Sequence, residues 1–150
     1  MQIKLDSESS DETELIGNKI GRHLKGGEVI DIKSDLGGGK TTLIRGLAKG
    51  AGSLDNVASP SFTISRVYET KKFKIYHFDF YRLNEPGLMK YEVADLLDDP
   101  KRVLVIEWSD IIKDTLPKDR LSIEIIAKSE TSRGIIINYQ KSLGYLIESL

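Results

Sequence analysis

SDLGGGKTT, residues 34–42, is a glycine-rich stretch between two segments of different hydrophobic periodicity. The run before it, EVIDIK (28–33), is typical of a strand. Apolar residues after it recur at helical spacing: Leu43, Ile44, Leu47, Ala48 and Ala51. A strand, a glycine loop and a helix in this order predict a phosphate-binding loop.

Each residue type in this loop suits that chemistry. Backbone N–H groups turned inward, together with the positive end of the helix dipole, bind phosphate oxygens. Gly37, Gly38 and Gly39 can take the left-handed or crowded conformations that such a cradle needs. We expect Lys40 to reach the outer phosphates and the Thr41 hydroxyl to bind Mg²⁺.

Ser34 departs from the pattern G-x-x-x-x-G-K-[ST], which has glycine at this position. It follows the predicted strand, where a small residue is needed but a positive φ is not always required. A glycine-rich helix entry without a ligand is the alternative, and the intact G-K-T favours phosphate binding. We expect Ser34 to affect nucleotide affinity more than chemistry, and Ser34→Gly to tighten ATP binding.

Two acidic residues are candidates for the second half of such a site. Glu107 closes the apolar run Val103–Ile106, so it would emerge at the tip of a buried strand and hold Mg²⁺. Asp79 lies in HFDFYR (77–82), where a period of two places it on one face with His77 and Tyr81. From the residues alone, both acids could also be structural, and His77 is interpreted as a hydrogen-bonded structural histidine.

The rest of the sequence predicts one α/β domain over residues 1–150. Ser9-x-x-Glu12 resembles a capping box, and apolar residues then recur at helical spacing until Gly26-Gly27 stops the run: Leu15, Ile16, Ile20 and Leu24. A further helix is expected after Pro86, and RVLVIEW (102–108) reads as a buried strand of a parallel sheet. Other predicted strands are TISRVYE (63–69) and FKIYHFDFYR (73–82), joined by a hairpin turn at 70–72, then LSIEIIA (121–127) and GIIINY (134–139), with a weakly helical end at 141–150.

Composition narrows the function classes. The chain has 150 residues, 39% of them hydrophobic, and a formal net charge of -1, without the basic surplus that binding to bare RNA or DNA usually needs. It has no cysteine and two histidines, which makes a zinc site improbable. The acidic, polar start (1–14) does not resemble a secretory signal, and no apolar run reaches membrane-spanning length. We therefore expect a cytoplasmic protein.

Four separated motifs resemble the TsaE family of small P-loop ATPases from bacterial tRNA threonylcarbamoyladenosine biosynthesis. They are SDLGGGKTT (34–42), SPSFT (59–63), HFDFYR (77–82) and IEW (106–108), in the family's order and rough spacing. The resemblance implies a P-loop NTPase-like three-layer fold with a mainly parallel central sheet and a β-hairpin. The usual family loop reads G-D-L-G-A-G-K-T, so this chain differs at Ser34 and Gly38, and Ser61 replaces the threonine of the usual S-P-T.

The resemblance also implies roles for individual residues. Gly37 to Thr42 would wrap the phosphates of ATP, and Thr41 with Glu107 would hold Mg²⁺. Lys40, Asp79 and Glu107 would be catalytic, with Asp79 assisting the metal or the attacking water. Thr13 and Arg133 match positions that touch the nucleotide, although from the residues alone Thr13 could be a first-turn helix residue and Arg133 a solvated charge. SPSFT would be a switch-like loop in which the Ser61 hydroxyl keeps a polar role.

The function that follows is Mg²⁺-dependent ATP hydrolysis in the threonylcarbamoyl transfer machinery, on a partner complex of the TsaB-TsaD type. Contact with tRNA would be indirect, through those partners. A small-molecule kinase is the first alternative, with Arg66, Arg82 and Arg102 available for a lid, and a non-hydrolysing nucleotide-gated adaptor is the second. A GTPase is disfavoured because no N-K-x-D element follows the loop.

Overall fold

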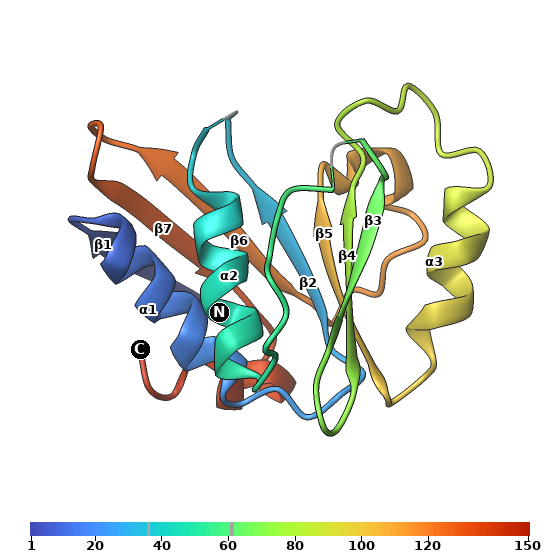
Figure 1. The fold of residues 1–150 in the computed structure, drawn as a ribbon, viewed down its shortest axis with the longest axis horizontal. Helices are drawn as coiled ribbons and strands as arrows, with labels where there is room; N and C mark the ends of the chain where they lie inside the picture. Colours follow the sequence, from blue (N-terminus) through green and yellow to red (C-terminus); the bar gives the residue numbers. More distant parts are fainter. Residues whose placement is uncertain (36, 61) are drawn as a thin grey trace.

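The computed structural model describes residues 1–35, 37–60 and 62–150, which form a seven-stranded sheet with helices on both faces (Figure 1). The strand order is β1-β7-β6-β2-β5-β4-β3. The strands are β1 (Gln2–Ser7), β2 (Val29–Lys33), β3 (Ser65–Glu69), β4 (Lys74–Asp79), β5 (Arg102–Glu107), β6 (Leu121–Ala127) and β7 (Arg133–Asn138). The helices are α1 (Ser10–Gly21), α2 (Lys40–Gly50) and α3 (Met89–Leu97), with 3-10 turns η1 (Ser109–Ile112) and η2 (Lys141–Ile147).

The four inner strands β6, β2, β5 and β4 pair in parallel, and the outer pairs β1–β7, β7–β6 and β4–β3 are antiparallel. The predicted α/β fold with a parallel centre and a β-hairpin is confirmed. The hairpin turn lies where expected, since the Thr70 hydroxyl donates to the Phe73 carbonyl at 2.6 Å. RVLVIEW supplies β5, which lies inside the sheet between β2 and β4 and is buried on both faces.

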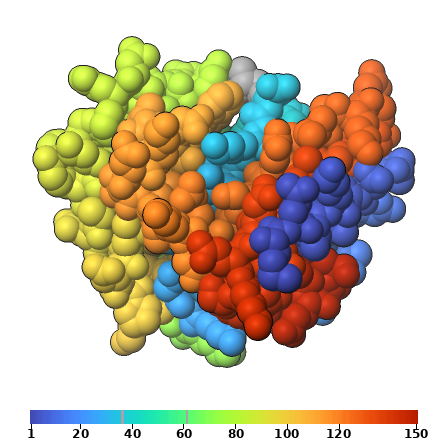
Figure 2. All heavy atoms as spheres, turned by 180° about the vertical axis from the view of Figure 1, so that it is seen from behind, coloured from blue at the N-terminus to red at the C-terminus, as the bar shows by residue number. Residues whose placement is uncertain are grey.

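Alternation along the strands divides the core between the two faces. Ile30 and Val105 point toward α1 and α2, within one buried cluster. Val29, Leu104 and Val93 of α3 belong to the cluster on the opposite face. Seen from behind (Figure 2), the yellow-to-orange segment between β4 and β6 lies on one side, and the late strands with the dark blue first residues lie on the other.

Helices α1 and α2 touch through glycine. A Cβ added to Gly17 would lie 2.1 Å from the Leu43 carbonyl oxygen, and one added to Gly46 would lie 1.9 Å from that of Glu14. Gly21 and Gly50 are equally crowded against the facing helix. The two backbones are therefore in direct contact, which fixes α2 and the loop that precedes it against α1.

The structure corrects three expectations. Strand β1 was not predicted, although Ile3, Leu5 and Ser7 alternate inward along it. Helix α1 begins at the predicted cap, where the Ser9 hydroxyl accepts from the Glu12 amide, but it ends at Gly21 rather than at Gly26. Leu15 was placed on its apolar face, but that side chain is half exposed because glycine and Thr13 form the buried seam.

Candidate functional site

The glycine loop lies between the end of β2 and the start of α2, in the predicted order. Gly37 and Gly39 have φ of 73° and 101°, values that strongly favour glycine. Gly38 is restricted for another reason, because a Cβ there would lie 1.8 Å from the Ser34 hydroxyl oxygen. Ser34 follows β2 directly and donates to the Asp35 carbonyl at 2.7 Å.

A cavity of about 290 Å³ opens in front of this loop. It is lined by most of the predicted residues together with three others: Gly37, Gly38, Gly39, Lys40, Thr41, Thr42, Asp79 and Glu107, with Ser59, Tyr81 and Trp108. Residues from four separate segments of the chain therefore converge on one concave surface. A concave site lined by a glycine loop and a few convergent polar side chains is typical of a ligand site.

The two acids come together through the register of neighbouring parallel strands. Asp79 ends β4 and Glu107 ends β5, and the two are direct partners in the pairing. They also share a sheet face with His77 and Val105, the face that α2 covers. Both carboxylates thus lie at the carboxyl edge of the sheet, beside the start of α2, where ligands of open α/β sheets bind.

Lys40 is buried and its ammonium group points back over the loop. Its Nζ donates to the carbonyl oxygens of Ser34, at 3.2 Å, and Asp35, at 3.1 Å. The same group lies 5.2 Å from the centre of the Trp108 ring, which in turn packs against Tyr81 at 5.0 Å. The positive charge is therefore held at the cavity wall by backbone carbonyls and an aromatic face.

Glu107 is 2% exposed, and its partner is His77. The His77 Nε2 lies 2.8 Å from Glu107 Oε2, and its Nδ1 lies 2.9 Å from the Tyr68 hydroxyl. Burial raises the pKa of Tyr68, mainly because the ring hydroxyl is removed from solvent. The hydrogen bonding predicted for His77 is confirmed, and one of its two partners is the predicted magnesium ligand.

Asp79 is 7% exposed, and backbone groups hold both its side chain and its amide. Its Oδ1 accepts from the Tyr81 amide at 2.9 Å, and its own amide donates to the Ile64 carbonyl. The Ser59 hydroxyl lies 3.4 Å from Asp79 Oδ2. Asp79 therefore links the segment around Ser59 to the end of β4, which explains why Ser59 lines the cavity.

Ile64 and Trp108 are the two non-glycine residues with positive φ, 67° and 56°, in the described chain. Both flank an acid, since the Ile64 carbonyl accepts from the Asp79 amide and Trp108 follows Glu107. Bulky residues in this conformation carry backbone strain, which tends to gather at functional sites. This backbone strain lies next to the two acids, just before β3 at Ile64 and just after β5 at Trp108.

Thr13 and Arg133 line a smaller adjoining cavity of about 110 Å³, which shares Gly39 and Thr42 with the first. Arg133 Nε donates to the Gly38 carbonyl at 2.9 Å, so its side chain braces the glycine loop from outside. The Thr13 hydroxyl is 2.7 Å from that of Ser7. The two residues lie beside the loop but outside the cavity that holds the acids, and the contact with nucleotide expected of them stays a prediction.

Sequence reasoning missed Ser59 and Trp108 as lining residues. The signal that could have pointed to Trp108 is its position directly after Glu107. The expectation for Ser61 falls outside the described residues. None of the lid candidates Arg66, Arg82 and Arg102 lines the main cavity, and Arg82 packs on Phe62 instead.

Comparison with known proteins gives the family. The family model described as "Threonylcarbamoyl adenosine biosynthesis protein TsaE" matches residues 7–135. The chain belongs to the TsaE family. The TsaE protein of Bacillus subtilis is 35% identical over 138 residues, covering 89% of this chain and 84% of the relative. That of Streptomyces coelicolor is 37% identical over 115 residues, covering 73% and 76%.

A solved structure supports the same placement. The crystal structure of Bacillus subtilis YdiB superimposes with a TM-score of 0.76 at 31% sequence identity, covering 99% of this chain and 93% of the other. The P-loop NTPase-like fold expected of a TsaE protein is thus the observed one. Within the described residues of this chain, no helix is long and apolar enough to cross a membrane.

Proposed function

We propose that this TsaE-family chain is the ATP-hydrolysing component of tRNA threonylcarbamoyladenosine biosynthesis. The observation that carries the proposal is the alignment of Asp79 and Glu107, as register partners, at the cavity that the glycine loop and Lys40 also line. The names of the relatives supply the pathway. Hydrolysis would take place in the cytoplasm, on a partner complex of the TsaB-TsaD type.

The residues present fit a magnesium nucleotide. The positive φ of Gly37 and Gly39 orients loop backbone in a way that suits phosphate, with α2 starting directly behind. The oxygen donors available for Mg²⁺ are the Thr41 hydroxyl and the Glu107 carboxylate, with Asp79 nearby. Among the described residues no group of three or more His, Cys, Asp or Glu could hold a metal, which suits an ion that takes its other ligands from phosphate and water.

The roles of the side chains follow from charge and position. Lys40 would exchange the carbonyls of Ser34 and Asp35 for outer phosphate oxygens, which need a cation more than neutral carbonyls do. Bound Mg²⁺ would neutralise charge on the phosphates during transfer. Asp79 would orient the attacking water, and Glu107 would hold the metal through its remaining oxygen.

The neutral overall charge supports action through protein partners. A net charge of -1 over 150 residues gives little general attraction to an RNA backbone. We therefore infer that tRNA is reached through the partner complex, and that hydrolysis changes the docked state of this chain rather than transferring the threonylcarbamoyl group.

The direct test is ATP turnover by the purified chain, alone and with TsaB-TsaD-type partner proteins, together with co-purification of the mixture. We expect phosphate release that requires Mg²⁺ and rises with the partners. Acceptor-dependent release of ADP in a screen of metabolites would support the kinase alternative instead. ATP binding without release of phosphate, with the partners present, would support the adaptor.

A further inference from the structure

A chain of buried polar groups connects Glu107 to the backbone of Ala58. Glu107 Oε2 contacts His77 Nε2 at 2.8 Å, His77 Nδ1 contacts the Tyr68 hydroxyl at 2.9 Å, and that hydroxyl donates to the Ala58 carbonyl at 3.1 Å. Tyr68, His77 and Glu107 are each at most 2% exposed. Solvent therefore supplies almost none of their hydrogen bonds.

The donors and acceptors in this chain can be assigned from its ends. The Ala58 carbonyl only accepts, so the Tyr68 hydroxyl donates its single proton there, and its oxygen lies 2.9 Å from His77 Nδ1. The Glu107 carboxylate accepts from His77 Nε2–H. Each residue in this chain thus has its neighbour as a hydrogen-bond partner. Removing one side chain leaves a buried polar group without that partner.

The same short segment also reaches the second acid. Ser59 follows Ala58, and its hydroxyl lies 3.4 Å from Asp79 Oδ2. Residues 58 and 59 are therefore bonded to both carboxylates of the cavity, to Asp79 directly and to Glu107 through Tyr68 and His77. Strands β3 and β4 carry the two intermediate side chains, Tyr68 and His77.

We propose that Tyr68 and His77 are positioning residues that fix the Glu107 carboxylate and tie its position to that of the Ala58–Ser59 segment. The imidazole engages one carboxylate oxygen, which orients the other for the cavity. A shift of the segment at 58–59 then moves both acids together. This inference rests on the proposed ATPase function, which it deepens by naming what aligns the acid pair.

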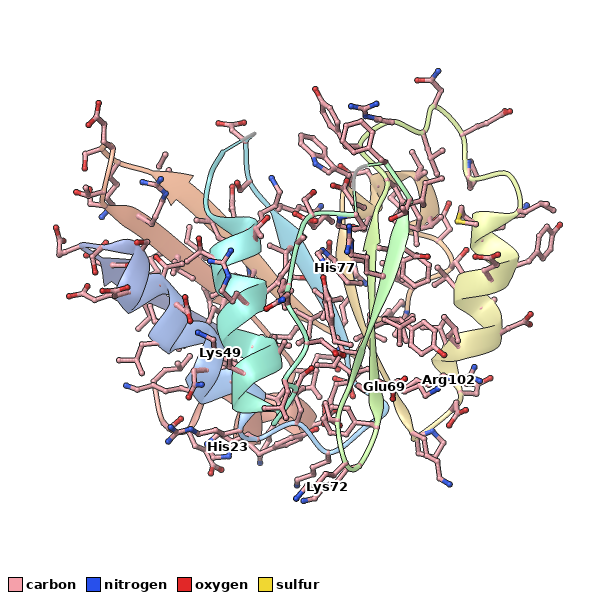
Figure 3. The ribbon with its side chains drawn as sticks, viewed as in Figure 1. His23, Lys49, Glu69, Lys72, His77 and Arg102 are labelled. Atoms are coloured by element: carbon pink, nitrogen blue, oxygen red, sulfur yellow. The ribbon has the colours of Figure 1, made fainter. Side chains whose placement is uncertain are left out.

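The first test needs no nucleotide. The chain has two histidines, which lie far apart in the fold, as Figure 3 shows for the labelled His23 and His77. In the ¹⁵N-histidine NMR spectrum we expect a protonated Nε2 on His77, protected from exchange. Tyr68→Phe should shift the Nδ1 signal of His77 and leave the partly exposed His23 unchanged. An unprotonated Nε2 on His77, or no change in Tyr68→Phe, would overturn the inference.

The second test measures the consequence for turnover. Tyr68→Phe keeps the ring and removes the hydroxyl, so the protein should fold while His77, which holds Glu107, loses its second contact. Outer-layer partners of metal ligands typically contribute ~10- to 100-fold to activity, and we expect a fall of that size in kcat with unchanged ATP affinity. Tyr145→Phe is the matched control, since its hydroxyl bonds Glu28 away from the cavity.

A third variant separates positioning from general packing. His77→Gln retains an N–H donor for Glu107, whereas His77→Leu does not, so the glutamine variant should recover part of the kcat that the leucine variant loses. Equal kcat in Tyr68→Phe and wild type would refute the inference while leaving the ATPase proposal intact. Absence of ATP binding by the wild-type chain with its partners would refute the ATPase proposal, and the histidine spectrum would still report on the buried chain.

Discussion

Asp79 and Glu107 are direct register partners at the ends of two parallel strands, and both carboxylates face the cavity in front of the glycine loop. Their backbone alignment is set by strand pairing rather than by loops, so the separation of the two strand ends is rigid. The two acids nevertheless have different surroundings. Glu107 contacts an imidazole, and Asp79 accepts from a backbone amide.

We predict that Lys40→Ala and Glu107→Gln separate nucleotide binding from hydrolysis. Losing a charge-assisted hydrogen bond to phosphate should weaken ATP binding by about 10- to 150-fold in Lys40→Ala. Glu107→Gln keeps the shape and an acceptor for His77, so binding should persist while turnover falls roughly 100-fold. Calorimetry and phosphate release measure the two effects. Unchanged turnover in both variants would contradict the assignment.

A second prediction concerns Ser34 and Gly38, the two loop positions that differ from the usual TsaE loop. A Cβ at residue 38 would lie 1.8 Å from the Ser34 hydroxyl oxygen, so the serine occupies space that an alanine side chain at residue 38 would need. Gly38→Ala alone should therefore weaken ATP binding, and Ser34→Gly combined with Gly38→Ala should restore it. A double-mutant cycle should give a coupling of about 1 kcal/mol or more. Simple additivity would show that the positions are independent.

A third prediction concerns the seam between α1 and α2. Gly46→Ala places a methyl group 1.9 Å from the Glu14 carbonyl oxygen, and backbone on both sides cannot move aside as a side chain would. Overpacking of this kind costs roughly 1–3 kcal/mol, against which the helix propensity of alanine returns at most about 1 kcal/mol. The thermal midpoint should fall by several degrees. Gly144→Ala is the control, because its Cβ would meet nothing closer than 4.0 Å.

A fourth prediction concerns alkaline pH. Burial, and then the hydrogen bond to Glu28, raise the pKa of Tyr145 above its ordinary value of 10.0. An acid whose pKa is raised by folding stabilises the fold below its unfolded pKa, so this contribution should be lost as pH rises above 10. Urea unfolding from pH 8 to 11 should show a falling free energy of unfolding. The fall should be shallower in Tyr145→Phe, and an identical slope in the two proteins would exclude this tyrosine as its source.

The strand, loop and helix around Lys40 could be predicted from sequence because each has a local signal. Two features had weak signals or none. Hydrophobic periodicity cannot detect a helix seam made of glycine, so Leu15 was placed inward and Gly17 was overlooked. The alternation of Ile3 and Leu5 is short, and the edge strand β1 that it forms depends on pairing with β7, more than 125 residues away.

The site was predictable to the extent that its residues belong to contiguous motifs. Glu107 was correctly placed at the end of its strand, whereas Asp79 was expected inside the strand 73–82 and in fact ends β4. The bond between His77 and Glu107 joins residues on different strands and depends on their register, which sequence reasoning did not supply. The match between Ser34 and Gly38 likewise depends on the path of the loop in space.

The glycine contact between α1 and α2 limits which part of the cavity wall can move during a reaction cycle. Two helices separated by side chains can slide past each other because those side chains repack. Two helices that touch through main chain have no intervening side chains that could repack. The half of the cavity built on α2 is therefore the rigid half. We therefore expect adjustment during a reaction in the opposite half, where Ser59 and Glu107 are held by side-chain hydrogen bonds.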